Sequence, residues 1–200
     1  MAHLYPGIMS GNPPFDIATP FVVFLGQRRI AQGDRAAAAQ AAWRAGDAPP
    51  SPLVLDRRTG LVVDLDLRGS AADMALGYAL APEEAANTPA RRGRPKLGVV
   101  PREVTLLPRH WDWLSAQPGG ASAALRRLVE AAVRADGDAT PRRARIDAAY
   151  RFMSTMAGDL PGFEEAARAL YANDHEGLRD RIRAWPADIA EETLIILGEA

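Results

Sequence analysis

Four prolines between Pro82 and Pro101 limit the fold of this chain more than any other feature of its sequence. Proline lacks a backbone N–H and its ring fixes φ, so repeated prolines exclude a long helix or a paired strand. We therefore expect residues 82–101 to form a basic linker with a folded part on each side. A chain of 200 residues is long enough for such parts to bury a core.

The composition is that of an ordinary soluble protein, with 48% hydrophobic and 24% charged residues. The chain contains no cysteine, which excludes disulfides, thiolate metal sites and a cysteine nucleophile. The first residues lack the basic and apolar regions of a signal peptide, and no apolar run is long enough to span a bilayer. These features predict a soluble, cytoplasmic protein with no membrane partner.

The N-terminal part, residues 17–81, has the pattern of a small ββαββ unit. Two short runs, 21–25 and 28–32, predict a hairpin, and Asp34 can cap an alanine-rich helix over 35–45 that Gly46 ends. A second predicted hairpin pairs 53–55 with 61–67, where apolar and polar residues alternate.

The C-terminal part, residues 138–200, reads as a set of helices, so the fold class predicted for the chain is α+β. Apolar residues at helical spacing predict helices ending near Gly158 and Tyr171. Asp174 can cap a third helix, and Pro186 can open a last one that reaches about Leu197. We interpret the methionine and aromatic stripe of these helices as core.

Charge is distributed unevenly along the chain. Residues 91–145 contain 12 Lys and Arg against 5 acids, whereas the remaining residues contain 12 against 20. Such a contrast indicates a polyanionic partner such as DNA. The alternative is a GC-rich genome that encodes arginine at any surface position, although this does not explain why acids avoid the segment.

A basic motif lies inside the linker and resembles the AT-hook, a short segment that binds the minor groove of A·T-rich DNA. Glycine would allow close approach to the groove, proline would hold the chain extended, and arginines would enter a narrow groove of negative potential. The alternative is a basic tether without a partner. The motif comprises Arg91, Arg92, Gly93, Arg94, Pro95 and Lys96.

Residues 102–136 resemble the ribbon-helix-helix family of DNA-binding domains. The order is a short strand over 103–107, a helix over 109–117, the turn Pro118-Gly119-Gly120 and a second helix capped by Ser122. The resemblance implies a homodimer whose paired strands enter the major groove. The alternative is a strand and two helices within a larger helical domain, with Trp111 and Trp113 as core.

The resemblance also implies a set of DNA contacts. On the strand, Glu103 and Thr105 would face base edges, and Arg102 would meet phosphate. The start of the second helix, with its free N–H groups, would bind another phosphate, and the closest match to the family includes Ser122 and Arg126.

Over its whole length the chain is also similar to an uncharacterised bacterial family known only as a domain of unknown function. The similarity rests on the hairpins and on two stretches, RGRPKLGVVPREVTLLPRHWDWL and AYRFMSTMAGDLPGFEEAARALY. It implies that the segments belong to one protein unit, and it implies no activity.

Enzymatic chemistry has a single weak candidate, the carboxylates of Asp64 and Asp66, which an i, i+2 spacing on a strand would place on one face. The chain has no phosphate-binding loop and no dinucleotide fingerprint, and its three histidines lie far apart. No catalytic residue, metal site or cofactor is predicted. The sequence favours a DNA-binding protein, a transcriptional regulator or nucleoid-associated factor; the alternative is a non-enzymatic interaction module whose linker tethers two folded halves.

Overall fold

A computed structural model describes residues 19–70, 72, 77–78 and 102–199 of the chain. The chain divides into two compact units. The first, here called the sheet unit, comprises residues 1–84 and 140–200, and the second, the two-helix unit, comprises residues 85–139. The N-terminal strands and the C-terminal helices therefore belong to one packed body.

The sheet unit is built on a four-stranded antiparallel sheet with the order β2-β1-β3-β4. Its strands are β1 (Phe21–Leu25), β2 (Arg28–Gly33), β3 (Pro52–Asp56) and β4 (Leu61–Val62). The predicted first hairpin is confirmed, with β1 paired to β2 and Gly26 at φ 59 in the connecting turn. Central strand β1 pairs with β3 on its other side.

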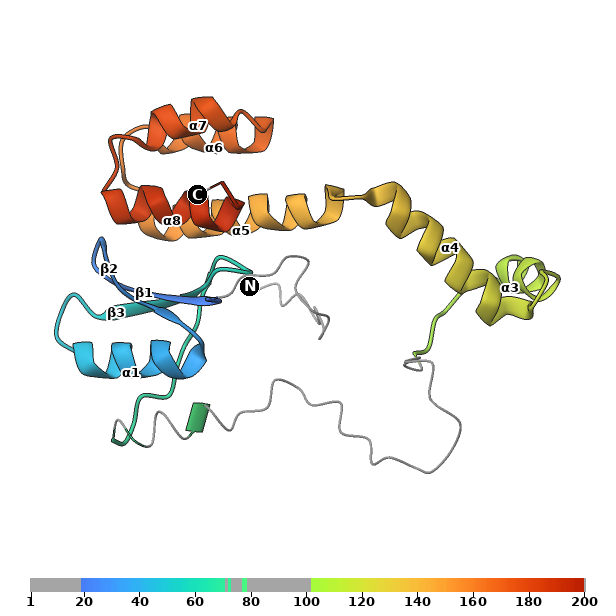
Figure 1. Cartoon of the computed structure of the whole chain (residues 1–200), viewed down its shortest axis with the longest axis horizontal. Coiled ribbons are helices and arrows are strands. Elements are labelled where there is room, and N and C mark those ends of the chain that lie inside the picture. Colours follow the sequence, from blue (N-terminus) through green and yellow to red (C-terminus); the bar gives the residue numbers. More distant parts are fainter. Residues whose placement is uncertain (1–18, 71, 73–76, 79–101, 200) are drawn as a thin grey trace. The chain divides into compact units, whose positions relative to one another are not determined.

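Helix α1 (Arg35–Ala45) covers one face of the sheet (Figure 1). Asp34 caps it by accepting a hydrogen bond from the Ala37 N–H at 2.8 Å, and Gly46 follows its last residue, as the sequence predicts. The small alanines of α1 let the helix approach the sheet closely, where Phe21, Val23 and Val54 are buried against it.

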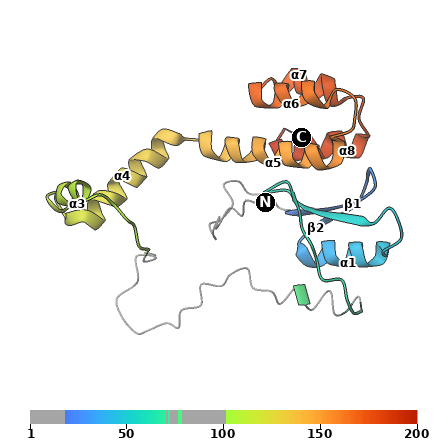
Figure 2. The same cartoon turned by 180° about the vertical axis from the view of Figure 1, so that it is seen from behind.

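Four further helices lie on the opposite face and beyond it (Figures 1 and 2). They are α5 (Ala139–Ala157), α6 (Phe163–Ala172), α7 (His175–Ile182) and α8 (Ala187–Leu197). Alternation along β1 and β3 directs Val22, Phe24 and Leu55 into the core that these helices complete. The rings of Phe24 and Phe152 lie 5.7 Å apart in this core. The predicted core role of the C-terminal apolar stripe is confirmed.

The second hairpin is shorter than the sequence predicts, because β4 ends at Val62 and residues 63–67 carry no strand. Leu65 is buried among residues of the α1 side, and the Tyr78 hydroxyl donates to the Asp66 carbonyl at 3.2 Å. After a last hydrogen bond from the Val63 N–H to the Val54 carbonyl at 2.8 Å, the chain leaves the sheet edge and packs Leu65 beneath α1.

The described part of the two-helix unit contains α3 (Pro108–Ser115) and α4 (Gly120–Asp136). Gly119 adopts φ 83 between them, a left-handed conformation that glycine tolerates best. Arg127 donates from Nη1 to the Pro118 carbonyl at 3.1 Å and so fastens the turn to α4. Leu114 and Ala124 are the buried hydrophobic residues of this unit within the described region.

Candidate functional site

The described part of the segment predicted to contact DNA begins with residues 102–107, of which all but the half-buried Leu106 are exposed. Residues 102–107 have no regular secondary structure, so the strand predicted over 103–107 is not present in the single chain. A strand is defined by hydrogen bonds to a neighbouring strand. In the ribbon-helix-helix family, which this segment resembles, that neighbour is the same strand of a second chain. Arg102, Glu103 and Thr105 are all exposed.

The cap of α4 lies three residues before the predicted one. Helix α4 begins at Gly120 with Gly119 as its cap, and no side chain caps it, so the predicted capping role of Ser122 is wrong. The left-handed backbone of Gly119 lets the chain enter the helix directly from the turn, which leaves Ser122 inside the first turn. Arg126 and Ser122 are both exposed on α4.

The AT-hook-like motif lies outside the described residues. The structure does not describe its six residues, which are Arg91, Arg92, Gly93, Arg94, Pro95 and Lys96. The hook therefore stays a prediction from the sequence.

The described arginines of the two-helix unit all lack an ion-pair partner, which holds for only some of the described arginines of the sheet unit. Among described residues, the arginines from 102 to 134 form no ion pair within 4.0 Å; they are Arg102, Arg109, Arg126, Arg127 and Arg134. In the sheet unit ion pairs hold some of the described arginines, whereas others, such as Arg28, Arg35 and Arg142, form none within 4.0 Å; the paired ones are Arg29, Arg57, Arg58, Arg68, Arg168, Arg179 and Arg183. The two-helix unit thus presents cations that its own acids do not neutralise.

The same unit exposes a large amount of apolar surface. Trp111 is 39% exposed and Trp113 is 53% exposed, so the alternative in which both tryptophans form core is wrong for this structure. Further exposed hydrophobic side chains of the unit are Val104, Leu107, Leu128, Val129 and Val133. Exposed apolar side chains in such number are typical of surfaces that contact another molecule.

The carboxylates considered for enzymatic chemistry do not form a site. Asp64 and Asp66 lie beyond the end of β4 and both are exposed. Asp66 accepts hydrogen bonds from Arg68 at 2.7 and 2.5 Å, and these side-chain bonds, with one from the Arg68 N–H, lower the pKa of Asp66 to about 2. The described residues contain no group of three His, Asp or Glu that could hold a metal ion.

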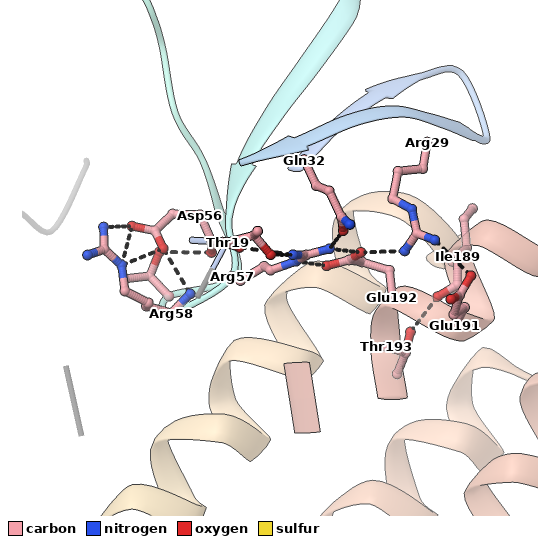
Figure 3. A network of polar contacts seen from close by, with 11 residues as sticks. Thr19, Arg29, Gln32, Asp56, Arg57, Arg58, Ile189, Glu191, Glu192 and Thr193 are labelled. Carbon is pink, nitrogen blue, oxygen red and sulfur yellow. Dashed lines mark hydrogen bonds and ion pairs between the residues drawn. The ribbon is translucent and has the colours of Figure 1, made fainter. Parts of the chain in front are cut away.

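A buried ion-pair network in the sheet unit was not predicted from the sequence (Figure 3). Arg57, in the turn after β3, donates to both carboxylate oxygens of Glu192 on α8, at 2.5 and 2.8 Å. Arg57 also donates to Thr19 and Gln32, and Arg29 donates to Glu192 at 3.0 Å. Every polar side-chain atom buried in the described residues has a partner, so the network holds the fold together and leaves no group free for a ligand.

One sequence signal could have indicated this network. Glu192 lies at helical spacing between Ile189 and Ile196, both buried, so it occupies the apolar stripe of α8. An acid in such a stripe predicts a buried cation as its partner. Its partner Arg57 stands in a loop whose sequence carries no such signal.

No helix in the described part of the chain is both long enough and apolar enough to cross a membrane. No curated protein and no solved structure matches the chain. A family model described as "Uncharacterized protein conserved in bacteria (DUF2239)" matches residues 20–196. The match includes the sheet, the linker and the helices that follow, and the chain therefore belongs to this uncharacterised bacterial family.

Proposed function

We propose that this protein binds DNA as a homodimer and acts as a transcriptional regulator or nucleoid-associated factor. The observation that carries the proposal is the set of arginines in the two-helix unit, none of which is paired with a carboxylate among described residues. Arginines without an internal counter-charge are available to phosphates, whose neutralisation supplies much of the affinity of DNA-binding proteins.

The proposed contacts follow the order of the chain. The arginines of residues 91–96 would enter the minor groove, and Arg102 would bind a phosphate. Glu103 and Thr105 would meet base edges once residues 103–107 pair with the same residues of a second chain. Arg126 and the first turn of α4, which contains Ser122, would bind a further phosphate. None of the five described side chains in this set is buried, which supports the assignment.

Binding of fluorescently labelled duplex DNA, measured by anisotropy, tests the proposal. Arg102→Ala should weaken binding across sequences and make the slope of the salt dependence shallower by about two units, since the homodimer loses one phosphate-binding cation from each chain. Arg94→Ala should also weaken binding, because it removes a minor-groove arginine from each chain. Arg183→Ala is the matched control, because Arg183 is exposed but pairs with Asp180 at 2.8 Å. If Arg183→Ala weakens binding as much as the other two variants, the binding reflects overall charge and the assigned contacts are wrong.

Duplexes of different composition separate the two parts of the proposed interface. The minor-groove arm should favour A·T-rich duplex, and Arg94→Ala should abolish that preference. Arg102→Ala should weaken binding to both duplexes and keep the preference. A preference that survives Arg94→Ala would remove the AT-hook assignment.

A protein-interaction module is the second candidate function, and the exposed apolar side chains of the two-helix unit favour it. In that case the basic linker serves as a tether. In that case the chain would not bind duplex DNA even at low salt, while the two-helix unit would still bind a partner protein.

A further inference from the structure

Helix α4 carries an apolar stripe that its own chain leaves uncovered. From Arg126 to Asp136 every residue is exposed, and Val129 and Val133 are exposed by 58% and 64%. Helical spacing places Leu125, Val129 and Ala132 along one line, with Leu128 and Val133 on either side of it. The buried residue of α4 is Ala124, in the second turn, so the exposed stripe occupies the later turns.

The stripe fits a second copy of the same helix. Only Leu114 and Ala124 are buried hydrophobic residues in the described part of the two-helix unit, far fewer than a stable core needs. The centre of the stripe consists of aliphatic side chains alone, without a charge that a partner would have to neutralise. A two-fold interface uses one patch twice, and a purely aliphatic patch is complementary to itself.

The charges beside the stripe select the orientation. Arg126 and Glu130 lie four residues apart on one flank of α4, and neither forms an ion pair in the single chain among described residues. In a parallel pair this flank would face the opposite flank of the second copy, where α4 carries Ala131 and Ala135, so Arg126 and Glu130 would gain no charged partner. In an antiparallel pair with its two-fold axis between Leu128 and Val129, Arg126 comes level with Glu130 of the second copy to within about 1.5 Å along the helix axis.

We propose that α4 pairs antiparallel with α4 of a second copy, with the two-fold axis at Leu128 and Val129. The proposal deepens the homodimer of the proposed function by adding an interface between the two α4 helices, here called the seam, to the pairing of residues 103–107. The seam forms without DNA, because it buries aliphatic side chains and joins Arg126 to Glu130 within the protein. A guanidinium carries five donors, so Arg126 can bind Glu130 and still reach a phosphate.

Cysteine cross-linking of the full chain tests the orientation, since the natural sequence contains no cysteine. Val129→Cys lies at the axis, so oxidation should convert most of that variant to a disulfide-linked dimer. Val133→Cys is the control, because Val133 is on the same helix and even more exposed, yet antiparallel pairing sets it opposite Ala124. Cross-linking at 129 alone supports the seam; equal cross-linking at both positions, or at neither, overturns it.

The mass of the particle in solution gives a second readout. The wild-type chain should sediment at twice its 21.5 kDa, Val129→Glu at the monomer mass, and Arg134→Glu, on the opposite side of α4, at the dimer mass. A wild-type monomer, or a Val129→Glu dimer, overturns the seam. DNA binding is measured on the same samples: a dimer that fails to bind duplex contradicts the proposed function and leaves the seam intact.

Discussion

Arg57 and Glu192 form a bidentate ion pair in the interior of the sheet unit, with Nε and Nη2 of the arginine 2.5 and 2.8 Å from the two carboxylate oxygens. The two residues are 135 positions apart in the chain, and the exposed fractions of their side chains are 2% and 0%. The pair joins the turn after β3 to α8 (Figure 3). The N-terminal sheet and the C-terminal helices are thereby tied into one body.

Removing one partner of this pair should destabilise the protein strongly. Glu192→Ala leaves Arg57 buried without its carboxylate, and breaking a buried pair in this way costs about 3–5 kcal/mol of unfolding free energy. The double variant Arg57→Met/Glu192→Leu should lose less unfolding free energy than Glu192→Ala does, because the double variant leaves no buried charge without a partner. Urea denaturation followed by circular dichroism measures both.

Arg183→Ala serves as the control for that comparison. It breaks the exposed pair between Arg183 and Asp180, which should contribute less than about 1 kcal/mol. If Arg183→Ala and Glu192→Ala lose equal unfolding free energy, the buried pair is no more important to stability than the exposed pair, which contradicts the account.

Gly60→Ala should destabilise the sheet unit by forcing the turn before β4 away from α5. Gly60 has φ +69, and a Cβ there would lie 2.0 Å from the carbonyl oxygen of Ala148. Gly162→Ala is the control, with φ +80 and open space around the added methyl, and it should cost only the left-handed strain of about 1–2 kcal/mol. Thermal unfolding should show the larger loss for Gly60→Ala; equal losses would mean that the close approach to Ala148 is absent.

Asp66 should titrate near pH 2, because hydrogen bonds from Arg68 stabilise its carboxylate. A lowered pKa means that the contribution of Asp66 to stability is present above its ordinary pKa of 3.8 and is lost as the pH falls through about 2. Carboxyl carbon NMR shifts measure the titration, and Arg68→Ala should move it back toward 3.8. A wild-type Asp66 that titrates near 3.8 would contradict the pairing.

Much of the sheet unit could be predicted because local signals and tertiary packing agree there. Three of its features depend only on neighbouring residues: the hairpin turn at Gly26, the cap of α1 at Asp34 and the end of α1 at Gly46. The cap of α7 is similar, since Asp174 accepts from the Gly177 N–H at 2.9 Å. Such elements need no knowledge of distant residues.

Features that depend on distant residues could not be predicted in the same way. The alternation over 61–67 is typical of a strand, yet the burial of Leu65 beneath α1 draws the chain out of the sheet. Arg57 and Glu192 are 135 positions apart, and only the folded structure brings them into contact. At the candidate site, Arg102, Thr105 and Arg126 are exposed, as DNA contacts need to be, whereas the cap predicted at Ser122 is wrong because Gly119 caps α4.

The most direct test of DNA binding is the affinity of the wild-type chain for a labelled duplex as a function of salt. If arginines of the two-helix unit and the linker neutralise phosphates, the logarithm of the association constant should fall linearly with the logarithm of salt concentration, by about 0.9 for each phosphate neutralised. For a dimer that neutralises at least two phosphates, the affinity should fall at least about tenfold between about 50 and 200 mM salt. An absence of binding at low salt, or an affinity that salt does not change, would contradict the proposed function.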